Sequence, residues 1–273
     1  MRPGNLLLIW ILTATLIGCA QTPTTDTAAQ PEPPPEPVAI TDAHRAYVRE
    51  QADLGLVLFE KDEMAAIATQ ILFEERVLPF DERVDGWVVE TRGEYDFPIV
   101  YFLGPGPDGI RSYHAVGFPY GEPRYTPSNQ STERLTGMYS ARTQALNSLT
   151  YYCAERYNTV VLEDEGHWLV YTMPATLEDN VMLVGGFHRV VIDKADDYLV
   201  AAEPLTRSCL ELPLDNNHEV LYVTHIVDDT PTALHSFLSL SYDVTLYVGT
   251  RTGVWRAQDG QLTPVKIDAD SAH

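Results

Sequence analysis

The sequence predicts an α+β protein with a mainly antiparallel β-sheet, and three observations predict it. Apolar residues repeat at helical spacing near the start of the chain and again in its middle. From residue 158 onward, short apolar runs alternate with turn sequences. No repeat of fixed period is present. We therefore expect N-terminal helices, one long central helix and antiparallel strands within a single globular domain, residues 41–268.

Two helices are expected at the start of this domain. Thr41 is a suitable N-cap for a helix over residues 42–58, with Gly55 as its weak point. Asp62 can cap a second helix, which Pro79 ends. The second helix has one apolar face, formed by Met64, Ile67, Ala68, Ile71 and Leu72.

The long central helix is expected over residues 131–155. Its apolar stripe contains Leu135, Met138, Tyr139, Ala145, Leu146, Leu149, Tyr152 and Cys153. Arg142 falls on the same stripe. An arginine on an apolar face is paired with a carboxylate, extends to the edge of the face, or holds an anionic ligand, and the sequence leaves these roles open.

Strands are expected over residues 86–90, 98–103 and 111–117, and later over 159–162, 168–173, 187–192, 198–203, 220–225, 236–241, 245–249 and 254–257. Residues 104–109 match the pattern GxGxxG of dinucleotide-binding loops. That motif requires a helix to begin at its third glycine, whereas another strand follows here. Two prolines also remove backbone N–H donors, so we interpret these residues as a hairpin loop.

The composition is that of an acidic globular protein. The 273 residues include 39 Asp and Glu against 18 Lys and Arg, a net charge of −21. Such a surface repels phosphates, so the sequence predicts no nucleic-acid partner. It also repels anionic lipid headgroups, so the domain is expected to stand away from the membrane surface.

The N-terminus has the parts of a bacterial export signal. Arg2 is followed by an apolar run from Leu6 to Leu16, which is shorter than the roughly 20 residues of a spanning helix. Leu16-Ile17-Gly18-Cys19 at its end resembles a bacterial lipobox. The resemblance implies a signal peptide over residues 1–18 and lipid attachment, including an acyl chain such as palmitate, at Cys19. More than one chain makes such anchoring stable. Ala20 after the cysteine implies the outer membrane, on its periplasmic side.

Residues 19–40 are expected to link this anchor to the domain. Six prolines lie among Thr, Ala, Gln and Glu in this segment, a composition that favours extended polyproline II. At about 3.1 Å per residue the linker could reach roughly 60 Å. Residues 269–273 are expected to form a short tail.

Lipid on Cys19 would leave Cys153 and Cys209 as a pair in an oxidising compartment. We expect a disulfide between them, which would contribute about 4 kcal/mol in the chain-entropy model. Two buried free thiols are the alternative.

The candidate chemical residues lie in the second half of the chain. His225 and His235 flank a loop that contains Asp228, and His188 lies on another expected strand. Such residues could converge on a metal ion or form an acid–base pair, or they could bond loop carbonyls at strand ends. The patterns HExxH, HxxEH and GxSxG are absent, and Ser208 has no base near it in sequence. The sequence therefore indicates no metal site and no cofactor.

Two segments, residues 185–189 and 231–240, resemble those of uncharacterised bacterial envelope proteins, a resemblance that implies no activity. We expect a lipid-anchored envelope protein with a non-catalytic binding or scaffolding domain. Its partners would be the membrane, through Cys19, and another envelope protein or a component of the cell wall. The alternative is a periplasmic hydrolase that uses the region of His225, His235 and Asp228, with or without a metal ion.

Overall fold

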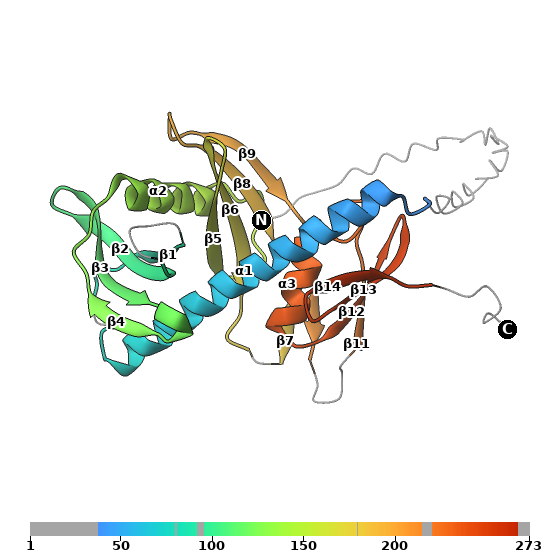
Figure 1. Ribbon diagram of the computed structural model, residues 1–273, viewed down its shortest axis with the longest axis horizontal. Helices are drawn as coiled ribbons and strands as arrows, with labels where there is room; N and C mark the ends of the chain where they lie inside the picture. The colour runs from blue at the N-terminus through green and yellow to red at the C-terminus, as the bar shows by residue number, and fades with distance from the viewer. Residues whose placement is uncertain (1–37, 80, 92–95, 179, 215–219, 267–273) are drawn as a thin grey trace, which may run out of the picture. The chain divides into compact units, whose positions relative to one another are not determined.

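The computed structural model describes residues 38–79, 81–91, 96–178, 180–214 and 220–266. Three expected segments lie outside these residues: the signal peptide (1–18), residues 19–37 of the linker, which include Cys19, and the tail (269–273). Within them, three α-helices and four β-sheets confirm the predicted α+β class (Figure 1).

Helix α1 (Asp42–Glu74) is continuous, so the prediction of two N-terminal helices is wrong. Thr41 caps it as predicted, because its side chain accepts a hydrogen bond from the His44 N–H at 3.1 Å. Gly55 does not interrupt the helix. A Cβ atom on Gly55 would lie 2.4 Å from the Ser236 Cβ, so glycine allows α1 to pack closely against α3 (Ala233–Ser241).

The first sheet contains β1 (Gly86–Glu90), β2 (Ile99–Gly106), β3 (Gly109–Gly117) and β4 (Arg124–Pro127), in that order and all antiparallel. The hairpin between β2 and β3 includes the GxGxxG segment, as predicted. A single 3-10 turn (Pro119–Gly121) precedes β4. One face of this sheet packs on the second half of α1 through Ala65, Ala68 and Leu72.

Helix α2 (Glu133–Asn147) is shorter than the expected helix over residues 131–155, and Cys153 lies beyond its end. It packs on the other face of the first sheet and on a second antiparallel sheet. That sheet has the order β5 (Arg156–Asp164), β6 (His167–Ala175), β8 (His188–Asp193) and β9 (Leu199–Pro204). Helix α2 therefore lies between two sheets, and Leu135, Met138 and Ala141 are buried there.

The structure joins Cys153 and Cys209 by a disulfide, the pairing that the cysteine count favours. Cys209 lies just before β10 (Glu211–Pro213), which pairs with β7 (Val181–Leu183). Residues 208–210 pass so close to Gly185 that a Cβ atom there would lie 1.9 Å from the Ser208 carbonyl oxygen. Gly186 has φ +93° and faces Cys153. The two adjacent glycines thus allow the disulfide-linked segment to approach.

The last sheet has the order β11 (Val220–Thr224), β12 (Thr245–Thr250), β13 (Gly253–Gln258) and β14 (Gln261–Pro264). The strand expected over residues 236–241 is instead part of α3. Residues 233–239 of α3 are all buried, so the helix lacks the polar face that reveals an amphipathic helix in sequence. Helix α3 connects β11 to β12, which are parallel, and a crossover of this kind is what a parallel pair requires.

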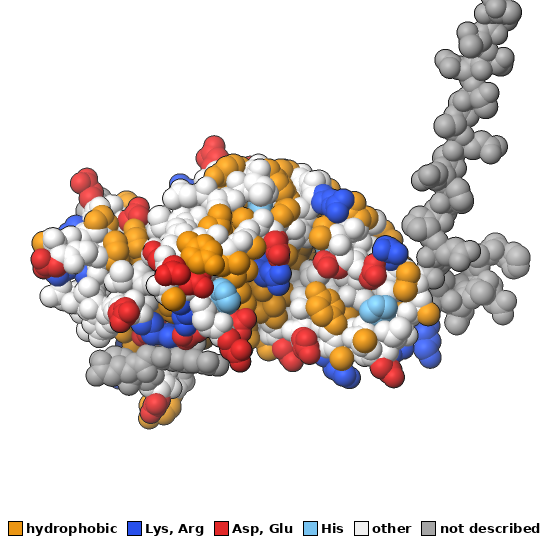
Figure 2. Space-filling model, turned by 90° about the horizontal axis from the view of Figure 1, so that it is seen from above, with side chains coloured by type: hydrophobic (Ala, Val, Ile, Leu, Met, Phe, Trp, Pro, Cys, Tyr) orange, Lys and Arg blue, Asp and Glu red, His pale blue; other side chains and the backbone are white. Residues whose placement is uncertain are grey.

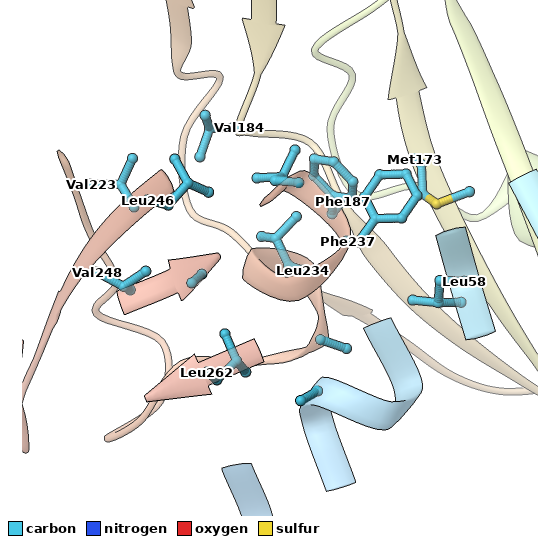
Figure 3. Close-up of a cluster of buried hydrophobic side chains, with 14 of the residues drawn as sticks. Leu58, Met173, Val184, Phe187, Val223, Leu234, Phe237, Leu246, Val248 and Leu262 are labelled. Carbon is cyan, nitrogen blue, oxygen red and sulfur yellow. The ribbon is translucent and has the colours of Figure 1, made fainter. Parts of the chain in front are cut away.

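The side chains of α3 lie at the centre of one hydrophobic core (Figure 3). Phe237 meets Phe187 edge to face, with ring centroids 6.1 Å apart. Leu234 lies near Leu246 and Val223 on the strands of the last sheet, and Leu58 and Met173 complete the cluster from α1 and β6. This core joins α1 and α3 with strands of three sheets.

Charged side chains of both signs are scattered over the face drawn in Figure 2, where Asp and Glu side chains lie among Lys and Arg. A search of the described residues finds no helix that has both the length and the apolar character needed to cross a membrane.

Candidate functional site

His225 and His235 are brought together, as the sequence allowed. His225 follows β11, and its Nε2 lies 3.2 Å from an Asp228 carboxylate oxygen. Its ring meets that of His235 edge to face, with centroids 4.7 Å apart. The two imidazoles and one carboxylate therefore form a local cluster at the start of α3.

His235 has a structural role in this cluster. It is 2% exposed, and its Nδ1 accepts a hydrogen bond from the Thr232 N–H at 3.1 Å, which caps α3. Burial, and next the neighbouring His225, lower the pKa of His235 to about 3, so the ring is neutral at physiological pH. Because Nδ1 accepts this bond, the ring proton is assigned to Nε2.

His188 lies elsewhere, in the first position of β8. One ring nitrogen, Nδ1, donates to the Gly186 carbonyl oxygen at 2.9 Å, and Nε2 bonds the Thr150 hydroxyl at 3.0 Å. The side chain is fully buried, and burial lowers its pKa. Neither His225 nor His235 is among its partners, so the structure unites only two of the three candidate histidines.

A cavity of about 410 Å³ adjoins His225 and His235. Its opposite wall is the disulfide-linked segment, with Thr206, Arg207 and Ser208. Ser208 forms no hydrogen bond with either imidazole in the part of the chain that the structure describes. In this structure, therefore, neither His225 nor His235 is hydrogen-bonded to Ser208 as a base that would activate it as a nucleophile. The described residues also contain no group of three or more His, Cys, Asp or Glu placed to hold a metal ion.

A larger groove, about 650 Å³, lies beside α2, and the sequence did not predict it. One wall is α2 with Thr136, Gly137 and Ser140. The other includes Trp168 from β6 and Lys194 from the turn after β8. These residues are distant in sequence, and no motif connects them. Only the abundance of aromatic residues and the helical period of α2 could have pointed to the region.

Trp168 forms the base of this groove between two cations. The Lys194 ammonium lies 4.3 Å from the indole centroid, and the Arg134 guanidinium lies at 5.6 Å. Both cations also pair with Glu163, whose pKa they lower. A Cβ atom on Gly137 would lie 3.2 Å from the indole nitrogen, so glycine allows α2 to pass over the ring.

Hydroxyl groups and carboxylates line the rest of the groove. The Ser140 hydroxyl donates to Asp197 at 2.8 Å, which ties α2 to the turn between β8 and β9. The Tyr139 hydroxyl donates to Asp85, and burial with this bond raises the pKa of Tyr139 to about 12. The groove therefore offers cations, carboxylates, neutral hydroxyls and part of an indole to one ligand.

No family model, no curated protein and no solved structure matches the chain.

Proposed function

We propose that the protein is a lipid-anchored binding protein of the bacterial cell envelope, held at the outer membrane through Cys19 and facing the periplasm. Its domain binds a polar ligand in the groove beside α2. The observation that carries this proposal is the groove itself, where Arg134 and Lys194 lie within one site with Asp197 and the hydroxyl of Ser140. Pockets that combine an apolar base with a few converging polar groups are the usual binding sites of proteins.

A ligand with both amino and carboxylate groups complements this lining. Peptides of the cell wall have that chemistry, and a tether of roughly 60 Å would let the domain search for them. The roles of His235 in capping α3 and of His188 in bonding Thr150 are structural, which favours binding over catalysis. The alternative is a hydrolase that uses the His225–Asp228 pair beside the 410 Å³ cavity.

The tether predicts that Cys19→Ala moves the protein from the membrane fraction to the soluble fraction. The lipid chains provide the anchor, at about 0.8 kcal/mol per buried CH₂ group, and the acidic domain has no attraction to anionic lipid. Fractionation of cells followed by immunoblotting measures the change. Ser148→Ala, in the folded domain, is the control and should leave the distribution unchanged. If all of the Cys19→Ala protein remained in the membrane fraction, the result would contradict lipid attachment at Cys19.

The groove predicts that Thr136→Trp weakens ligand binding at least about tenfold, because the indole would occupy the groove. Binding of the detergent-solubilised protein to wall peptides released from purified cell walls can be measured by calorimetry. Asn147→Trp is the matched control, since Asn147 is exposed at the end of the same helix and does not line the groove. Equal binding by both variants would contradict the proposal. Cleavage of the peptides that is lost in His225→Ala would favour the hydrolase.

A further inference from the structure

Arg142 is a buried cation, and no described residue accepts a hydrogen bond from its guanidinium. It projects from α2 toward β1 and is 8% exposed. Its guanidinium forms no hydrogen bond or ion pair with any side chain or carbonyl in the described part of the chain, and its Nε is fully enclosed. Arg134, about two helical turns earlier in α2, differs because it pairs with Glu90 and Glu163. Buried charges are normally paired, so Arg142 requires an explanation.

A second donor lies beside it. The Arg142 guanidinium lies 5.6 Å from the Trp87 ring centroid, and the Trp87 Nε1–H is also buried without an acceptor. Gly86 provides the space, because a Cβ atom there would lie 2.5 Å from the Arg142 Cζ. Two neighbouring elements therefore present unsatisfied donors in one small region.

The negative charge of Asp85 acts on Arg142 but does not satisfy these donors. Asp85 forms no ion pair with the guanidinium and accepts a hydrogen bond from the Tyr139 hydroxyl instead. Tyr139 also lines the groove beside α2, so this residue connects the groove to the surroundings of Arg142. Burial lowers the pKa of Arg142, as expected for a cation that lacks a close partner.

We propose that Arg142 binds an oxyanion, a carboxylate or phosphate group of a ligand, with the Trp87 Nε1–H as a second donor. Guanidinium groups recognise both oxyanions through parallel N–H bonds, and such charge-assisted bonds are strong in enclosed sites. The proposal deepens the proposed function, since it identifies an acidic group on the ligand. Acetate and phosphate carry the same oxyanion chemistry, so the proposal can be tested with these ions in place of the ligand.

The test measures thermal unfolding and tryptophan fluorescence of the detergent-solubilised protein with sodium acetate or inorganic phosphate, against sodium chloride at equal ionic strength. We expect acetate or phosphate to raise the unfolding temperature above chloride, and the stronger of the two identifies the group. Arg142→Met should weaken the response at least about tenfold. Arg45→Met, which removes an exposed arginine of α1, should leave it unchanged.

Two further variants keep the test decisive if Arg142→Met does not fold. Trp87→Phe retains the ring but removes the donor and should weaken anion binding several-fold. Asp85→Asn removes a competing negative charge and should strengthen it. A response no larger than that to chloride, which would mean that water alone bonds these donors, overturns the proposal. Suppose that Thr136→Trp leaves peptide binding intact while the anion response depends on Arg142. That result would contradict ligand binding in the groove and support the anion site at Arg142.

Discussion

Replacing both Cys153 and Cys209 by alanine should lower the free energy of unfolding by about 4 kcal/mol. The two residues are 56 positions apart, and the disulfide restricts a long loop of the unfolded chain. The native contacts that hold residues 208–210 against Gly185 would remain, including the Gly185 N–H bond to Leu210 at 3.1 Å. The effect should therefore come mainly from the greater entropy of the unfolded chain.

Chemical denaturation of the oxidised protein and of the double variant measures this change. The oxidised protein treated with a reductant is the matched control, and it should lose the same stability as the double variant. Cys209 is exposed, so the reductant can reach the bond. A double variant as stable as the oxidised protein would contradict the prediction, because it would show that the disulfide contributes nothing to the free energy of unfolding.

Asp62→Asn should stabilise the protein by up to about 3 kcal/mol above pH 7. Asp62 lies within α1, where its carboxylate accepts a hydrogen bond from the Asn158 amide at 3.0 Å. Burial raises its pKa from 3.8 to about 6, against the lowering effect of this bond. The folded protein thus binds a proton more tightly than the unfolded chain. The favourable contribution of Asp62 is full below pH 3.8 and is lost as the pH rises through 6.

The stabilisation by Asp62→Asn should depend on pH, and this dependence can be measured. Asparagine retains an acceptor for Asn158 and has no charge to bury, so its advantage over aspartate should grow by about 1 to 2 kcal/mol between pH 5 and pH 8. Urea denaturation at both pH values measures it. Asp53→Asn, at an exposed position of the same helix, is the control and should show no such growth. An advantage that is the same at both pH values would contradict a raised pKa.

Local patterns were enough to predict much of the fold. Thr41 caps α1, residues 104–109 form a hairpin, and alternating sequences from residue 158 form antiparallel strands. Arg142 lies on the apolar stripe of α2, as its position in the sequence indicates, and the structure shows that it is buried. These features depend on residues close in sequence, where the periods of helix and strand are visible.

Three structural predictions were wrong, and for the first two distant contacts outweighed a local signal. Gly55 and Asp62 suggested a break in α1, but Gly55 contacts Ser236 and Asp62 bonds Asn158 within one continuous helix. The apolar run at residues 236–241 suggested a strand, but it is a helix enclosed by α1 and two sheets. The central helix ends at Asn147, before Cys153.

The candidate sites divide in the same way. Sequence could identify His225, His235 and Asp228 as neighbours, because one short loop connects them. It could not show that His235 caps a helix and is too buried to be protonated, since that depends on the packing around α3.

The groove beside α2 and the unpaired Arg142 depend on tertiary structure still more. Trp168, Lys194 and Asp197 reach the groove from different strands and turns, and Gly86 and Trp87 approach Arg142 from another sheet. Composition and local period determined the fold class and the buried stripe of α2, because both follow from spacing along the chain. Only the packing of helices between sheets decided which charges are paired and which groups share a cavity, because pairing and burial depend on residues that are far apart in sequence.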